Sequence, residues 1–145
     1  MALLIRSLAA GDRAQWDVLW AGYLQFYETT LDAGVSDITF ARLIDPESAL
    51  FALVAEADGA LAGLAHCVLH PATWDAADYC YLEDLFVAPG TRGQGVGRAL
   101  IEAVYARADA LGCARVYWHT HESNKTAQAL YDRAATKSGF IVYRR

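Results

Sequence analysis

The chain has 145 residues, of which 55% are hydrophobic and 20% are charged, with a formal net charge of −5 and an isoelectric point near 5.2. This length suits one domain with its own core, and the composition is far from that of disordered chains. Nucleic-acid binding needs a basic surface, which the acidic balance argues against. We therefore expect one folded domain over residues 1–145 with no nucleic-acid partner.

The three cysteines, Cys67, Cys80 and Cys113, are widely spaced and odd in number. This pattern predicts neither a disulfide framework nor a zinc site and favours a reducing compartment. No apolar run approaches the roughly 20 residues that span a bilayer, and the charge at Arg6 comes too early for a secretory signal. The sequence therefore predicts a cytoplasmic protein with no membrane partner.

Hydrophobic periodicity and turn residues divide the chain into ten expected elements. In order these are strand 2–8, helix 13–29, helix 36–44, strand 49–56, strand 60–69, strand 79–87, helix 92–111, strand 115–120, helix 124–137 and strand 140–143. The order β-α-α-β-β-β-α-β-α-β starts with antiparallel strands and ends with two strand–helix units. It predicts an α+β fold with a mixed, mostly antiparallel sheet flanked by helices.

The stretch from Tyr79 to Leu100, YCYLEDLFVAPGTRGQGVGRAL, carries the clearest functional signal. It predicts a strand, a turn, a glycine-rich loop and an amphipathic helix. Glycines at the entry to a helix let backbone N–H groups converge on an anion, and the helix dipole adds positive potential. Arg92 and Arg98 flank the loop and are candidates for charge-assisted contacts. A phosphate-bearing ligand fits this pattern, although a glycine-rich turn also serves close packing alone.

Two common phosphate loops do not match the segment. A Walker A loop requires Gly-Lys-Ser/Thr, which is absent from this chain. A dinucleotide fingerprint read from Gly95 and Gly97 requires a third glycine where Leu100 stands.

The run Arg92-Gly93-Gln94-Gly95-Val96-Gly97 resembles the R/Q-x-x-G-x-G/A acetyl-CoA motif of the GNAT superfamily of N-acetyltransferases. The later segment VYWHTHESNKTAQALY is similar to that superfamily's second motif, with Asn124 and Tyr131 on one helix. The run from Tyr81 to Val87 resembles the branch that holds polyamine, histone and D-amino-acid acetyltransferases. The resemblance implies the GNAT fold, acetyl-CoA as cosubstrate, no metal, and acyl transfer to an amine by direct attack in a ternary complex.

Carried over by position, the resemblance also implies cofactor-binding residues. Backbone groups of residues 85–87, at the end of the strand, would contact the pantetheine arm and the thioester of the cofactor. Backbone N–H groups of residues 92–97 would hold its pyrophosphate. Asn124 would form a hydrogen bond to the pantetheine arm or to the opposite strand. The full set is Leu85, Phe86, Val87, Arg92, Gly93, Gln94, Gly95, Val96, Gly97, Arg98 and Asn124.

Two residues are candidates for the catalytic steps. A free alkylamine has a pKa near about 10, so an acceptor for its proton is useful at neutral pH. Glu83 is the candidate, and strand alternation predicts that it shares a face with Leu85 and Val87 while Asp84 points the other way. The departing CoA sulfur needs a proton donor, and the resemblance assigns this to Tyr131. Alternatively, Glu83 is solvated or paired with a basic neighbour, and Tyr131 is a tyrosine of the core.

The amine acceptor is expected to be a small molecule of polyamine or amino-acid type, or a protein. Its candidate site residues are Tyr27, Glu28, Trp74, Tyr81 and His119. Acids beside aromatic rings suit a cationic amine. The apolar C-terminal run 140–143 suggests a strand that pairs with a second copy in a homodimer. Alternatively, the charges of Arg144 and Arg145 would prevent pairing at this edge.

Two other function classes remain open from the sequence. One is a non-catalytic acyl-CoA-binding regulatory domain on the same fold. The other is a nucleotide-binding protein. The presence of both Glu83 and Tyr131 favours the enzyme.

Overall fold

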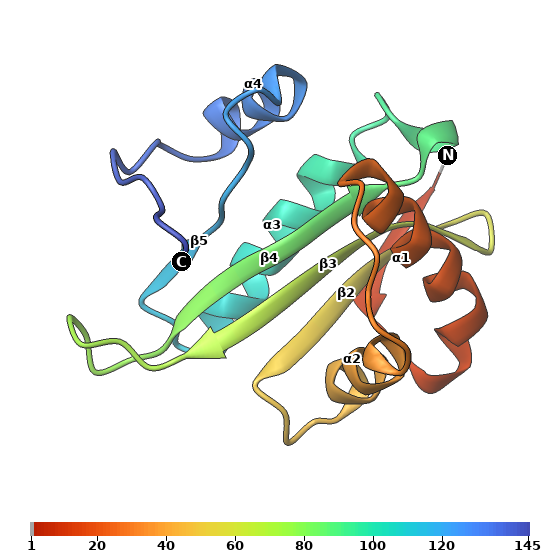
Figure 1. Ribbon diagram of the computed structural model, residues 1–145, viewed down its shortest axis with the longest axis horizontal. Coiled ribbons are helices and arrows are strands. Elements are labelled where there is room, and N and C mark those ends of the chain that lie inside the picture. The colour runs from red at the N-terminus through yellow and green to blue at the C-terminus, as the bar shows by residue number, and fades with distance from the viewer. Residues whose placement is uncertain (1) are drawn as a thin grey trace.

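A computed structural model describes residues 2–145, which form one five-stranded sheet in the order β1-β2-β3-β4-β5 with helices on both faces (Figure 1). The elements are β1 (Leu3–Ser7), α1 (Arg13–Phe26), α2 (Val35–Ile44), β2 (Leu50–Ala57), β3 (Ala60–His70), β4 (Tyr79–Val87), α3 (Val96–Ala110), β5 (Arg115–Tyr117) and α4 (Lys125–Ala134), with short 3₁₀ turns at Ala10–Asp12 and Pro89–Thr91. The first four strands are antiparallel and β5 joins β4 in parallel. The predicted α+β arrangement with a mixed sheet is confirmed.

Each face of the sheet carries its own core. Helices α1 and α2 cover one face, where Trp16 and Phe40 are buried against Leu64 of β3. Helix α3 covers the opposite face, where Leu100 and Val104 are buried with residues of β2, β3 and β4. Strand residues alternate between the two faces, so the central strands are apolar on both sides.

Strand β4 contains one extra residue relative to β3. Cys67 pairs with Leu82 and His66 pairs with Asp84, so Glu83 has no partner opposite it and forms a β-bulge. The expectation that Asp84 lies opposite Leu85 and Val87 is confirmed, but Glu83 occupies the bulge and does not follow the alternation that was to place it on their face. Leu85 and Val87 pack with the α3 core, whereas the Asp84 side chain contacts His66 on the α1 side. The bulge breaks the alternation on which that expectation rested.

The expected C-terminal strand 140–143 is also absent from the described chain. Its apolar side chains are exposed, with 66% to 88% of each surface accessible, and the segment joins no ladder. Strand β5 is only three residues long, so it offers a short edge for pairing. The element order therefore ends at α4, which also stops three residues before the expected end at Lys137.

Most other boundaries agree with expectation to within a few residues. The helix expected over 92–111 begins only at Val96, because the glycine loop occupies its predicted first turn. None of the helices in residues 2–145 is long and apolar enough to cross a membrane.

Candidate active site

The glycine loop between β4 and α3 has a backbone that only glycine adopts readily. Gly93 and Gly95 have φ angles of 78° and 81°, in the left-handed region. A Cβ atom built on either would meet nothing within 4 Å, so these glycines serve backbone conformation and leave open space beside the loop. Gly97 differs, because its Cβ would lie 3.2 Å from Leu130 of α4. The sequence pattern therefore encodes both a turn and a close approach of two helices.

The backbone amides of this loop are available to a ligand. Within residues 2–145, the N–H groups of residues 93–98 donate to no backbone carbonyl. They include the first amides of α3, which have no acceptor inside their own helix. Unpaired donors at a helix N-terminus with no side chain above them fit a pyrophosphate, and thus the coenzyme A that the motif implies.

The two arginines beside the loop lie in different surroundings. The Arg92 Nε donates to the Val87 carbonyl at 3.2 Å, and its guanidinium lies over the Phe86 ring at 5.6 Å. Arg98 instead pairs with Glu102 one turn along α3, at 2.9 Å on the exposed face. Arg92 is therefore held against β4, and Arg98 has an alternative partner.

Beyond Tyr81, β4 has no strand beside it on its β5 side within the described residues, since β5 pairs only with Tyr79–Tyr81. The Ala88 N–H donates to the Ala62 carbonyl, and hydrogen-bonded pairs alternate along an antiparallel ladder. Phe86, two residues earlier, therefore directs its backbone groups toward Leu64 of β3. Leu85 and Val87 direct theirs toward the open side, where an extended ligand can add to the edge.

Two polar residues follow β5. The Asn124 Oδ1 accepts the Ala127 N–H at 3.2 Å and caps α4, which confirms the expected helix start. The Thr120 hydroxyl oxygen is buried and makes no hydrogen bond within residues 2–145. Buried hydroxyl groups usually have a hydrogen-bond partner, so a polar ligand bound here would supply the partner that Thr120 lacks.

Tyr131 lies on α4, with its ring edge-on to Trp118 at 5.5 Å between ring centres. Burial, together with a smaller effect of nearby Tyr27, raises the pKa of Tyr131 to about 12. The phenol therefore keeps its proton across the physiological range. Tyr27 itself stands at the C-terminal end of α1.

The bulge in β4 gathers the acidic groups of the site. Partial burial, then the charge of Asp84, raises the pKa of Glu83. Burial and the charges of Glu83 and Asp84 also raise the pKa of Tyr81. Burial, then the charge of Asp84, raises the pKa of Tyr27. Both carboxylates therefore lie near Tyr81, and Asp84 also lies near Tyr27.

The sequence interpretation missed His66 and Asp84. The Trp16 Nε1 donates to the His66 Nε2 at 3.1 Å, and the His66 Nδ1 lies 2.9 Å from the Asp84 Oδ2. The only available signals were an adjacent pair of acids in the motif and a histidine in an apolar strand. Neither indicated that a bulge would place them side by side.

An aromatic group covers the adjoining end of the sheet. Tyr81 stacks on Tyr117 at 5.0 Å, and its hydroxyl lies 3.1 Å from the His119 Nδ1. His70 accepts the Tyr117 hydroxyl at 2.7 Å, because its Nδ1 donates to the Pro71 carbonyl. Two expected acceptor residues, Tyr81 and His119, are therefore in contact. Trp74 lies apart on a loop, 76% exposed, with Arg115 above its ring.

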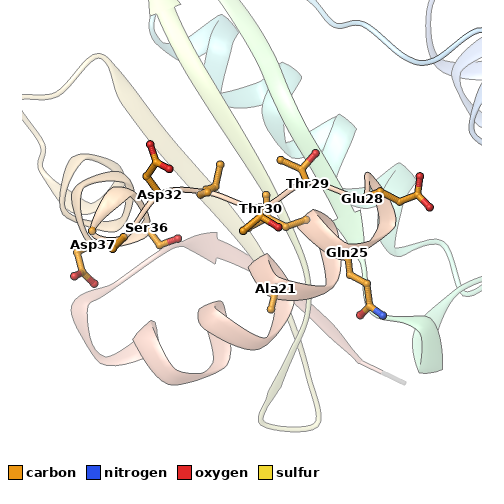
Figure 2. Close-up of a pocket in the computed structure, with 12 residues that line it drawn as sticks. Ala21, Gln25, Glu28, Thr29, Thr30, Asp32, Ser36 and Asp37 are labelled. Carbon is orange, nitrogen blue, oxygen red and sulfur yellow. The ribbon is translucent and has the colours of Figure 1, made fainter.

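Glu28 lies elsewhere. It lines an open hollow of about 830 Å³ between the end of α1 and the start of α2 (Figure 2). Glu28 and Asp37 stand at opposite ends of this hollow in the view, with Thr29, Thr30 and Asp32 between them. Neither the carboxylates of the bulge nor Tyr131 line it, so this hollow is separate from the group of residues at the bulge. Within the described residues, no three His, Cys, Asp or Glu side chains lie close enough to hold a metal.

A family model described as "Acetyltransferase (GNAT) family" matches residues 15–135, which include every element from α1 to α4. The chain belongs to the GNAT acetyltransferase family. It is 38% identical over 145 residues to the D-amino-acid N-acetyltransferase HPA3 of Saccharomyces cerevisiae, covering 99% of this chain and 90% of that protein. It is 29% identical over 142 residues to the uncharacterized N-acetyltransferase YhfO of Bacillus subtilis, covering 96% and 94%.

Solved structures of the family share the fold. The aminoglycoside acetyltransferase AAC(6')-Iy, solved in complex with the bisubstrate analog CoA-S-monomethyl-acetylneamine, superposes with a TM-score of 0.87 at 20% identity over 100% of this chain and 98% of that one. A ribosomal-protein-alanine N-acetyltransferase from Brucella melitensis gives 0.83 at 21% identity over 99% of both. The GNAT chain described here is thus an acetyl-CoA-dependent N-acetyltransferase that acts on an amine.

Proposed function

We propose that this GNAT enzyme acetylates the primary amine of a small cationic molecule of polyamine or amino-acid type, by direct attack in a ternary complex. The observation that carries the proposal is the pair of carboxylates at the β4 bulge, surrounded by Tyr27 and Tyr81. Negative charge beside aromatic faces suits an ammonium group. The D-amino-acid activity in the name of the yeast relative supports an amino acid as one acceptor class, and a protein amine is the alternative.

Bound acetyl-CoA supplies the acetyl group as a thioester. The amides of residues 93–98 hold its pyrophosphate, and the open edge of β4 at Leu85 and Val87 receives the pantetheine arm. The amide of Leu85 is the nearest backbone donor beyond the bulge for the thioester oxygen. The NH₂ group of Asn124 remains for the arm, since its oxygen caps α4.

Glu83 and Tyr131 serve the two proton transfers. Glu83 takes a proton from the acceptor ammonium, which frees the nitrogen lone pair, and its raised pKa brings it closer to neutral pH, where a base works best. The nitrogen then forms a bond to the acetyl carbon while the carbon–sulfur bond breaks. Tyr131 gives its proton to the sulfur and regains one from the nitrogen. The net products are the amide, free CoA and one proton.

The test is release of free thiol from acetyl-CoA with a panel of polyamines, D- and L-amino acids, aminoglycosides and lysine peptides. We expect release with at least one small cationic amine, and mass spectrometry should find one added acetyl group on its nitrogen. Release only with peptides would replace the small-molecule proposal by a protein acceptor. Tight CoA binding with no release on any amine would instead favour the non-catalytic regulatory domain.

We also infer a homodimer in the cytoplasm from two features. Within the described chain, the exposed apolar segment 140–143 joins no strand, and the three-residue edge strand β5 is paired on one side only, with β4. Pairing of such a segment with a second copy would bury both. The three cysteines are free thiols, which suits a reducing compartment.

A further inference from the structure

His66 is buried beside the bulge, with 3% of its surface exposed. An indole N–H can only donate, so the His66 Nε2 that receives the Trp16 bond must be an acceptor without a proton. The remaining ring proton is therefore on Nδ1, which donates to the Asp84 Oδ2 at 2.9 Å. Trp16 thus fixes both the charge state and the tautomer of His66.

This chain of bonds runs from the core to the acceptor site. Trp16 is fully buried and packs against Trp20 and Phe40, so its indole cannot turn away. His66 connects it to Asp84, whose side chain is 12% exposed. A carboxylate with one oxygen held by a fixed donor keeps the other oxygen in a defined direction. Asp84 is consequently better fixed than Glu83, which is exposed at the bulge.

We propose that Asp84 binds the ammonium group of the acceptor, and that His66 is the positioning residue that holds the Asp84 carboxylate in place for it. The inference rests on the proposed function and gives Asp84 and Glu83 separate roles. Asp84 holds the amine, and Glu83 takes its proton. A neutral His66 suits this task, because a charged imidazolium would compete with the ammonium for the carboxylate.

The surroundings of Asp84 support this division. The groups that face it are His66 of β3, Tyr23 and Tyr27 of α1, and Glu83 and Tyr81 of β4. Burial, followed by the charge of Asp84, raises the pKa of Tyr23, so this tyrosine remains a hydrogen donor. Within residues 2–145, no lysine or arginine forms an ion pair with Asp84, so its charge is left for a ligand.

Asp84→Asn is the principal test, because an asparagine oxygen still accepts the His66 N–H while the charge is lost. For the amine found by the panel, we expect KM to rise about tenfold or more and KM for acetyl-CoA to stay unchanged. The acidic limb of kcat/KM should move to lower pH, since a negative neighbour of Glu83 is gone. Asp109→Asn, the same change at the exposed end of α3, is the control and should match the wild type.

His66 variants separate positioning from packing. An asparagine amide takes the place of Nδ1 and can still donate to Asp84, whereas a glutamine amide reaches the Nε2 position and serves Trp16. His66→Asn should therefore keep a lower amine KM than His66→Gln. Equal KM values, both near the wild type, with only lowered thermal stability would show a packing role and overturn the proposal.

The outcomes remain separable if a His66 variant fails to fold, because Asp84→Asn preserves the bond network. Active wild-type enzyme with an Asp84→Asn variant of unchanged amine KM overturns this inference and leaves the proposed function standing. Wild-type protein that acetylates no amine overturns both.

Discussion

The ring of Tyr131 meets the indole of Trp118, the residue after β5, edge-on with 5.5 Å between their centres, so this packing holds the phenol in place. Replacing Tyr131 with phenylalanine keeps this packing and removes only the hydroxyl. We expect kcat to fall by about two to three orders of magnitude with KM for acetyl-CoA nearly unchanged. Steady-state kinetics would measure this, and near-normal turnover would refute the role as proton donor.

The raised pKa of Tyr131 also predicts the alkaline behaviour of the enzyme. A donor must carry its proton, and burial keeps this phenol protonated until the pH approaches about 12. We expect no loss of kcat from Tyr131 ionisation below about pH 11. A pH–kcat profile with a falling limb near pH 10 that disappears in Tyr131→Phe would contradict the expectation.

Glu83→Gln removes the proposed base while keeping the shape of the side chain. We expect kcat/KM to fall by about 10²-fold near pH 7, and the deficit to shrink toward pH 10, where free amine is available without help. Because the pKa of Glu83 is raised, wild-type activity should fall as the pH drops through a value above that of an ordinary glutamate. Glu47→Gln, remote from the bulge, is the control. A pH–rate profile identical to the wild type would remove Glu83 from the mechanism.

The glycine loop offers a matched pair of substitutions. Gly95 has a φ of 81°, whereas Gly90 lies outside the left-handed region, and neither has an atom within 4 Å of a built Cβ. Gly95→Ala should therefore distort the loop at a cost of about 1–2 kcal/mol and weaken CoA binding by about tenfold or more. Gly90→Ala should bind normally. Isothermal calorimetry with CoA measures both, and equal affinities would show that the loop does not hold the ligand.

A partly buried ion pair near the N-terminus stabilises the fold. The Arg6 guanidinium donates to both oxygens of Asp12 at 2.8 and 3.0 Å, and the Ala9 N–H adds a third bond. The hydrogen bond from Arg6, partly offset by burial, lowers the pKa of Asp12. We expect Asp12→Asn to cost about 2–3 kcal/mol of unfolding free energy at pH 7.

The pH dependence of that loss checks its origin. A lowered pKa adds stability above the unfolded value of about 3.9, and the gain disappears as the pH falls through the folded pKa. The difference between wild type and Asp12→Asn should thus shrink between about pH 5 and pH 2. Asp17→Asn, which removes an exposed pair with Arg13, should cost less than about 1 kcal/mol. Urea unfolding at several pH values would measure both variants.

The proposed homodimer depends on the exposed C-terminal segment. Ile141 is 74% exposed, so an aspartate there should not disturb the fold of the single chain. Ile141→Asp should shift the protein from dimer to monomer in analytical ultracentrifugation, with the same circular dichroism. A monomeric wild type, or a dimer that the substitution leaves intact, would exclude pairing through this segment.

Local pattern was sufficient for much of the fold and for the cofactor loop. The Asp58-Gly59 turn, the apolar runs beside it and the glycines at 93 and 95 each act on their own neighbours, so the sequence displays them directly. The missing strand at 140–143 shows the limit, because strand propensity cannot supply a partner edge.

The acceptor half of the site depended on a feature that pattern does not display. Strict alternation predicts that Asp84 points away from Glu83, and a lone histidine in an apolar strand predicts no role for His66. A bulge arises from how β3 and β4 pair, which no single segment encodes. The Trp16–His66–Asp84 chain joins three positions far apart in the sequence and becomes visible only in three dimensions.

That one inserted residue also reverses the alternation along β4, so that even-numbered positions before it and odd-numbered positions after it face the same core. Cys80 and Leu82 pack in the α3 core on one side of Glu83, and Leu85 and Val87 pack against that core on the other. Deleting Glu83 would therefore restore a regular ladder with these four side chains still on the α3 face. The strand tolerates the insertion without losing its core, and the extra position is left for a polar side chain.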